Sequence, residues 1–145
     1  MQIGKYPEAM YRVSLKAIIQ NSDSHVLVVK EKGSAWSLPG GGLDHGESID
    51  AALRRELYEE TLITDSFTSQ LIGADSFYVE NKKRWQLWLV YRIALPRNFT
   101  YGVGADADVV TFIDPEALNA SPHRSERLVC KWSKKNRLHG FTSVP

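Results

Sequence analysis

Short apolar runs separated by polar turns make up most of this chain. Residues 11–20 alternate between apolar and polar side chains, and a second apolar run, Val26–Lys30, follows the turn-forming residues 21–24. Alternation with a period of two is typical of strands, and a turn signal between two such runs predicts a hairpin. We therefore expect these two segments to pair with each other.

A second hairpin is predicted in the middle of the chain. The apolar runs 69–79 and 84–94 flank the polar segment 80–83, whose sequence is Glu-Asn-Lys-Lys. This arrangement again favours two antiparallel strands joined by a turn. Trp85 and Trp88 are separated by an odd number of residues, so in a regular strand they face opposite sides of the sheet.

The remaining segments complete an α/β pattern. Residues 95–107 contain proline and glycines and predict a loop, Val109–Ile113 predicts a strand, and residues 125–138 predict a terminal helix. A central helix follows the glycine-rich turn 40–42. Strands with one central and one terminal helix predict a mixed β-sheet flanked by helices, an α/β/α sandwich.

Length and composition agree with one compact domain over residues 1–145. Of the 145 residues, 43% are hydrophobic, which suffices for one core, and no apolar run approaches the length of a membrane span. The N-terminus lacks the apolar stretch of a secretory signal, so we expect a cytoplasmic protein that does not enter a membrane. A formal net charge of +1 gives no long-range attraction to duplex nucleic acid. The single cysteine, Cys130, is expected to pack in the core.

Three glutamates on the central helix are the main candidates for chemistry. Glu56 lies three and four residues before Glu59 and Glu60, so the three carboxylates share one patch. At about 100° per residue, Glu56 and Glu60 fall in the same sector as the apolar Ile49 and Leu53. Carboxylates at the edge of a buried face are costly unless they are paired or bound to a metal. A solvated acidic surface remains the alternative.

The ligands of such a site would all be oxygen atoms. No histidine or cysteine lies at ligand spacing. A set of oxygen ligands alone favours a hard cation, Mg²⁺ first and Mn²⁺ second, over zinc. Because Mg²⁺ usually binds through one or two carboxylates together with substrate phosphates, a di- or polyphosphate is the expected substrate class. The expected chemistry is attack of water on phosphorus, with one carboxylate as general base.

The segment 41–63 resembles the Nudix box, a pattern of glycine, glutamate and an Arg-Glu-x-x-Glu-Glu core at fixed spacing. Leu62 departs from it, because the family normally has glycine there; we expect the helix to end differently, one or two residues later. The matching positions in this chain are Gly41, Glu47, Arg55, Glu56, Leu57, Glu59, Glu60 and Ile63.

The resemblance implies roles for these residues. Glu56, Glu59 and Glu60 would be metal ligands, with the Gly40 carbonyl as a fourth ligand and Glu56 also as the base. Glu47 and Arg55 resemble the family's structural ion pair, in which a salt bridge braces the loop against the helix; a catalytic part for Glu47 is the alternative.

Outside the box, the candidates are weaker. The resemblance implies an extra acidic residue near Asp106 and Asp108, although solvated loop acids are common. Some family members that act on dinucleoside polyphosphates have a tyrosine about fifteen residues after the box, and in this chain that residue is Tyr78. Tyr78 and Trp85 are also candidates for stacking on a base. Both are also consistent with packing.

The function implied by the resemblance is a magnesium-dependent pyrophosphohydrolase. Its substrate would be a nucleoside diphosphate linked to another moiety, such as a nucleoside triphosphate, a dinucleoside polyphosphate or a nucleotide sugar. A homodimer is possible, since many relatives form one. The alternative from another class is a non-catalytic Nudix-like module that binds a nucleotide or a protein.

Overall fold

The computed structural model describes residues 10–138. Eight main elements and two short 3-10 helices follow one another along these residues. In chain order they are β1 (Tyr11–Ile18), β2 (Val26–Lys30), β3 (Gly40–Gly42), α1 (Ile49–Thr61), β4 (Thr68–Val79), η2 (Glu80–Lys82), β5 (Arg84–Ala94), β6 (Val109–Ile113), η3 (Pro115–Leu118) and α2 (Arg124–Leu138).

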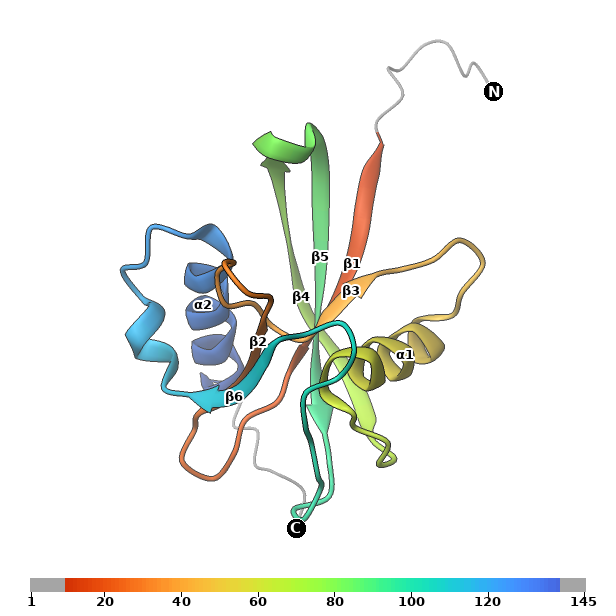
Figure 1. Cartoon of the computed structure of the whole chain (residues 1–145), viewed down its shortest axis with the longest axis vertical. Coiled ribbons are helices and arrows are strands. Elements are labelled where there is room, and N and C mark those ends of the chain that lie inside the picture. Colours follow the sequence, from red (N-terminus) through yellow and green to blue (C-terminus); the bar gives the residue numbers. More distant parts are fainter. Residues whose placement is uncertain (1–9, 139–145) are drawn as a thin grey trace.

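A four-stranded sheet stands between the two helices. Its strand order is β3-β1-β5-β4, with β1 and β5 parallel and the other two pairs antiparallel. Strands β2 and β6 form a separate antiparallel pair. Helix α1 lies on one side of the larger sheet, and α2 lies with the β2–β6 pair on the other side (Figure 1). The predicted mixed α/β/α sandwich is therefore confirmed.

The predicted pairing of residues 11–20 with β2 is wrong. Strands β1 and β2 belong to different sheets, and one bridge between Gln20 and Val26 is what remains of the expected hairpin. The reason is that β1 is buried on both faces, with Leu15 and Ile18 fully inaccessible to solvent. A strand of this kind is central, and its two edges are already taken by β3 and β5.

The second hairpin is confirmed. Strands β4 and β5 are antiparallel, and Tyr78 pairs with Trp85 next to the turn. Alternation puts Phe77 and Trp88 on one face, where their rings meet edge to face at 5.7 Å, and Tyr78 and Trp85 on the other. Trp88 is 6% exposed and belongs to the core, whereas Trp85 is 46% exposed.

Helix α1 begins and packs as its sequence predicts. The Ser48 side chain caps the N-terminus by accepting a hydrogen bond from the amide of Ala51. Ala52, Leu53 and Leu57 are buried in the cluster between α1 and the sheet. The same rotation of the helix carries the acidic side chains to the margin of this buried face.

The end of α1 differs from the prediction. The helix ends at Thr61, and Leu62 itself takes the left-handed conformation, with φ of 57° and its amide bonded to the Tyr58 carbonyl. The expectation that the helix would end one or two residues later is therefore wrong. Leu62 adopts the backbone that glycine would adopt, while its side chain packs beside Gly102.

We expect Leu62→Gly to be more stable than Leu62→Ala. Both variants lose the half-exposed leucine side chain, but only glycine relieves the left-handed strain. Glycine also gives the unfolded chain more conformational entropy, which offsets part of this gain. The free energy of unfolding should therefore be about 0.5–1 kcal/mol higher for the glycine variant. Urea denaturation of the two proteins measures this difference, and equal stabilities would contradict the strain at position 62.

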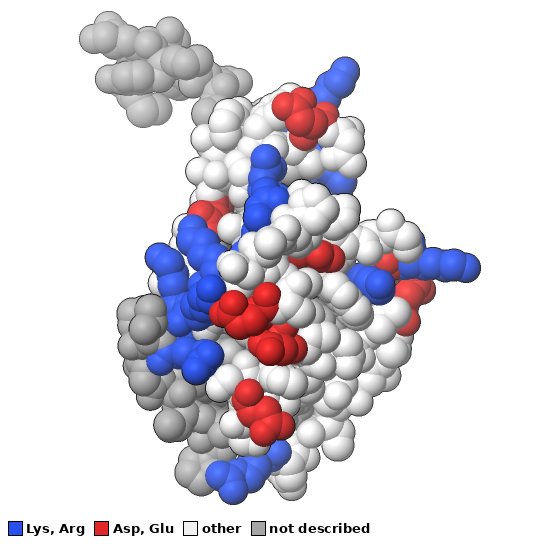
Figure 2. Space-filling view, turned by 90° about the vertical axis from the view of Figure 1, so that its left-hand side faces the viewer, with Lys and Arg blue, Asp and Glu red and all other residues white. Residues whose placement is uncertain are grey.

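Basic residues line the outer surface of α2. Acidic side chains are interleaved with them on this side of the molecule (Figure 2). Lys131 binds Asp75 at 2.8 Å, and Lys134 binds Glu116 at 3.1 Å. Cys130 faces inward and is buried, as expected. Across residues 10–138, no helix has the length and apolar character needed to cross a membrane.

Candidate active site

The guanidinium of Arg55 lies at the centre of the acidic cluster. Its Nη1 donates to Glu56 Oε1 at 2.8 Å and to Glu59 Oε2 at 3.2 Å. On its other side, Nε and Nη2 bind the two oxygens of Glu47 at 2.7 and 2.8 Å. Nη2 also donates to the carbonyl of Gly42 at 3.1 Å. One side chain thus joins the helix, the glycine strand and the loop before the helix.

The ion pair of Glu47 and Arg55 has the geometry that the resemblance implies. Its fork-to-fork arrangement is the strongest form of a carboxylate–guanidinium contact. The hydrogen bonds from Arg55 lower the pKa of Glu47 to about 2, and Glu47 in turn raises the pKa of Arg55. Both groups therefore stay charged at every physiological pH.

The glycine strand lies directly against the acidic side chains. A Cβ atom at Gly41 would come within 2.5 Å of Glu56 Oε2, so only glycine leaves room for this carboxylate. The amide of Gly40 donates to Glu60 Oε1 at 2.6 Å. The strand therefore positions two of the three predicted ligands through its backbone.

Burial raises the pKa of two glutamates. Desolvation raises the pKa of Glu60 to about 7, against the opposing effects of Lys16 and of the Gly40 amide. Desolvation and the neighbouring charge of Glu56 also raise the pKa of Glu59. Both shifts mean that negative charge is unfavourable here and that a cation would be bound favourably.

The loop after β5 closes the C-terminal end of α1. Backbone amides of Gly102, Gly104 and Asp106 donate to the carbonyls of Thr61, Glu60 and Glu59, at 2.8, 2.9 and 2.9 Å respectively. These carbonyls have no partner within the helix, so the loop supplies what the helix end lacks. A Cβ at Gly104 would collide with the Glu59 carbonyl, which explains the glycine.

The two loop acids have different surroundings. Asp106 lies beside Glu59 and contributes to the raised pKa of that residue. Asp108 instead accepts a hydrogen bond from the amide of Lys32 at 2.5 Å, and its own amide donates to the Lys30 carbonyl. Asp106 therefore belongs to the acidic cluster, and Asp108 holds a neighbouring turn.

Lys16 is a residue of this region that the sequence analysis missed. It lies in β1 opposite Gly40, and its Nζ is 3.3 Å from both the Ser37 hydroxyl and the Leu38 carbonyl. Burial lowers the pKa of Lys16, while Glu60 and Glu56 act in the opposite direction. In the sequence, Lys16 is one polar residue of an alternating strand, and nothing in that pattern indicates that it lies beside the glutamates.

Tyr78 and Trp85 lie away from Lys16. Both project from the sheet face opposite Trp88, and Trp85 contacts the ring of Tyr11 at 5.9 Å. Trp88, by contrast, has the Lys16 ammonium 4.8 Å from its ring centroid. The aromatic side chains nearest to Lys16 are therefore on the Phe77 and Trp88 face, and the candidates Tyr78 and Trp85 remain predictions.

The oxygen donors suit a hard cation in type and in charge. The carboxylates of the cluster outnumber the cationic groups that face them. The acids are Glu47, Glu56, Glu59, Glu60 and Asp106, and the cations are Lys16 and Arg55. Within residues 10–138, no three acidic, histidine or cysteine side chains are arranged to hold one metal ion together, and Arg55 donates to both Glu56 and Glu59.

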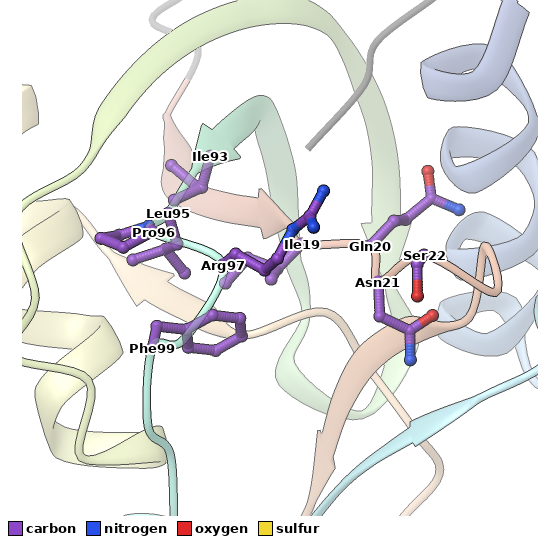
Figure 3. A pocket seen from close by; sticks show the side chains of 9 residues that line it. All are labelled: Ile19, Gln20, Asn21, Ser22, Ile93, Leu95, Pro96, Arg97 and Phe99. Atoms are coloured by element: carbon purple, nitrogen blue, oxygen red, sulfur yellow. The ribbon is translucent and has the colours of Figure 1, made fainter. Parts of the chain in front are cut away.

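Two pockets differ in their relation to this cluster. A pocket of about 170 Å³ is lined by Glu60 and Asp106 together with Ser37 and Lys30. A second pocket, of about 280 Å³, lies between the end of β1 and the start of the loop after β5, with a largely apolar floor including Phe99 (Figure 3). None of the predicted site residues lines the second pocket, whereas Glu60 and Asp106 line the first.

The raised pKa of Glu60 predicts a pH-dependent stability in metal-free protein. A carboxyl whose folded pKa is raised from 4.5 to about 7 adds stability below pH 4.5, and this contribution is lost as the pH rises to 7. Relative to Glu60→Gln, the wild type should lose about 3 kcal/mol between pH 4.5 and 8. Denaturant unfolding with a chelator present measures this difference.

Comparison with the variant isolates Glu60 from the other groups. Glu47, whose pKa is depressed, acts in the opposite sense, because its contribution is lost as the pH falls from 4.5 toward 2. Parallel stability curves for wild type and Glu60→Gln above pH 4.5 would contradict the raised pKa of Glu60.

Known proteins share the family and the fold of this chain. The NUDIX domain family model matches residues 10–131, and the chain belongs to the Nudix family. It is 34% identical over 90 residues to an RNA pyrophosphohydrolase of Methylococcus capsulatus, covering 61% of this chain and 40% of that protein. A Rickettsia rickettsii RNA pyrophosphohydrolase is 32% identical over 97 residues, covering 64% and 53%. The chain thus spans about half or less of the length of these relatives.

Solved structures share the fold at low sequence identity. A MutT protein from Methanosarcina mazei superposes with a TM-score of 0.72 at 18% identity, covering 91% of this chain and 99% of that one. The NUDIX domain of Shewanella oneidensis NrtR, in complex with ADP ribose, gives 0.70 at 18% identity, covering 96% of both chains.

Proposed function

We propose that this chain is a magnesium-dependent pyrophosphohydrolase, with manganese as a possible substitute. Its substrate is a nucleoside diphosphate linked to another moiety, and the reaction is attack of water on one phosphorus of the pyrophosphate linkage. The observation that carries the proposal is the acidic cluster itself: Arg55 donates to both Glu56 and Glu59, and Glu60 is bonded to the Gly40 amide and lines the neighbouring pocket together with Asp106.

The residues have separate tasks in this proposal. Glu56, Glu59 and Glu60, with the Gly40 carbonyl, would hold the cation. The Mg²⁺ ion, when bound, supplies charge neutralisation for the phosphate oxygens and activates water. Glu56 accepts the proton of the attacking water. Glu47 keeps Arg55 in place, and Asp106 adds negative charge next to Glu59.

The range of substrates includes nucleoside triphosphates, dinucleoside polyphosphates and nucleotide sugars. The relatives named RNA pyrophosphohydrolase also support RNA with a 5′-polyphosphate end as a candidate, since that end is a nucleoside polyphosphate. An ADP-ribose complex of a structural neighbour supports including ADP-ribose.

A panel assay tests the proposal. Purified protein with Mg²⁺ is offered each of these substrate classes, together with oxidised nucleoside triphosphates, and phosphate-containing products are quantified. Selective, Mg²⁺-dependent cleavage of one class is the expected result. Nucleotide binding by calorimetry without any product release would instead favour the non-catalytic binding module.

A further inference from the structure

Lys16 is a cation in the active-site region that the proposed reaction has not yet used. Its side chain is only partly exposed. Lys16 lies in the central strand β1, opposite Gly40 of the neighbouring strand β3. The amide of Gly40 donates to Glu60, so Glu60 lies on the same side. Lys16 thus reaches the acidic cluster from the sheet, whereas the predicted ligands reach it from α1.

The direct contacts of the Lys16 ammonium group are long hydrogen bonds. Its ammonium group donates to two neutral oxygens, the Ser37 hydroxyl and the Leu38 carbonyl, each at the long distance of 3.3 Å. No ion pair within 4 Å joins Lys16 to an acid among residues 10–138. An ammonium group has three N–H donors, so at least one is available to a ligand.

The surroundings of Lys16 indicate the kind of ligand. On one side lies Ser37, which also lines the pocket shared by Glu60 and Asp106. On the other side, the ammonium lies over the ring of Trp88 at 4.8 Å, and Phe77 packs against that ring. Because Trp88 is 6% exposed, its ring supports the ammonium group and offers no surface to a base. The ligand that a cation beside this pocket complements is an anionic group such as phosphate.

We propose that Lys16 is a substrate-binding residue whose ammonium group binds a non-bridging oxygen of the substrate's phosphate chain, on the side of the acidic cluster that faces Trp88. The inference rests on the proposed function in taking phosphate as the anionic group. It adds a residue outside the Nudix box, on the central strand, to the groups that determine how tightly the phosphate chain is bound.

The test separates phosphate binding from metal binding. Wild type, Lys16→Met and Lys16→Gln are titrated calorimetrically with Mg²⁺ alone, and then with inorganic pyrophosphate in the presence of Mg²⁺. Lys16→Gln retains polar contacts with Ser37 and Leu38, so it covers the possibility that the methionine variant folds poorly. Lys135→Met is the matched control, because this exposed lysine also lies over a tryptophan, Trp132, at 5.2 Å.

The expected result is a loss of about 10- to 100-fold in pyrophosphate affinity in both Lys16 variants, the range for one charge-assisted hydrogen bond. Their affinity for Mg²⁺ alone should be unchanged or higher, and Lys135→Met should resemble the wild type. Unchanged pyrophosphate affinity would overturn the inference. A fall in Mg²⁺ affinity that accounts for the whole loss would also overturn it, since Lys16 would then act on the acidic cluster alone.

The outcome does not depend on turnover. If no compound in the panel is cleaved, the proposed function fails while pyrophosphate binding still tests Lys16. If a substrate is found, Lys16→Met should raise KM more than it lowers kcat, because the contact is made with bound substrate as well as in the transition state. A loss confined to kcat would contradict a binding role.

Discussion

Replacing Glu60 by glutamine should abolish most Mg²⁺-dependent turnover while leaving the fold intact. Glutamine is nearly isosteric with glutamate, and its oxygen can still accept the hydrogen bond that the Gly40 amide donates to Glu60 at 2.6 Å in the wild type. It cannot supply the negative charge that a divalent cation requires. Because even outer residues of a metal site contribute about 10- to 100-fold, we expect a loss of at least about 100-fold for a ligand.

Glu59→Gln should behave in the same way, with a different effect on stability. The raised pKa of Glu60 means that its charge is unfavourable in metal-free protein, so Glu60→Gln should be more stable than wild type at pH 8. Glu59 is more exposed, and its replacement should change stability less. A variant that is inactive and at least as stable as the wild type cannot be explained by unfolding.

Steady-state rates with the substrate found in the panel, measured over a range of Mg²⁺ concentrations, provide the test. Glu80→Gln, at an exposed glutamate in the turn between β4 and β5, is the matched control and should retain full activity. Wild-type rates in Glu59→Gln and Glu60→Gln would refute the assignment of these carboxylates to the metal.

Local sequence was sufficient to predict how the acidic side chains of α1 lie relative to one another. The spacing of Glu56, Glu59 and Glu60 on a helix fixes their proximity, because neighbours on a helix surface are set by local geometry alone. The hairpin of β4 and β5 was predicted for the same reason, since its pairing depends on one short turn.

The parts that were missed depend on contacts between distant segments. Lys16 reaches the acidic cluster only because β1 pairs with β3 on one edge and with β5, in parallel, on the other. Parallel pairing joins residues more than seventy positions apart, and a turn signal carries no information about it. The turn after residue 20 was correctly predicted, but a turn does not determine which strand β2 pairs with.

The loop that closes α1 shows the same limitation. Glycine and proline in residues 95–107 predicted a loop, yet its role follows from three amides that bind the last carbonyls of a distant helix. This docking places Asp106 beside Glu59 and separates its role from that of Asp108. Two loop acids that are equivalent in sequence thus become different once the helix end has been paired.

Removing the charge of Arg55 should destabilise the protein more than removing any single acid around it. Arg55→Met keeps the aliphatic stem but deletes the contacts with Glu56, Glu59 and the Gly42 carbonyl. It leaves the carboxylates facing one another without the cation between them. Because the Arg55 side chain is 29% exposed, we expect a loss of about 2 kcal/mol, below the 3–5 kcal/mol typical of a fully buried pair.

Added Mg²⁺ distinguishes the physical cause of this loss. If the carboxylates repel one another in Arg55→Met, a divalent cation should restore much of the lost stability, and more in this variant than in the wild type. Arg55→Lys retains a charge but cannot form the bidentate contact with Glu47, so its stability should lie between the two. Thermal unfolding of the three proteins, with and without Mg²⁺, gives the comparison. A wild-type melting temperature in Arg55→Met without metal would show that Arg55 is not what holds the acidic cluster together.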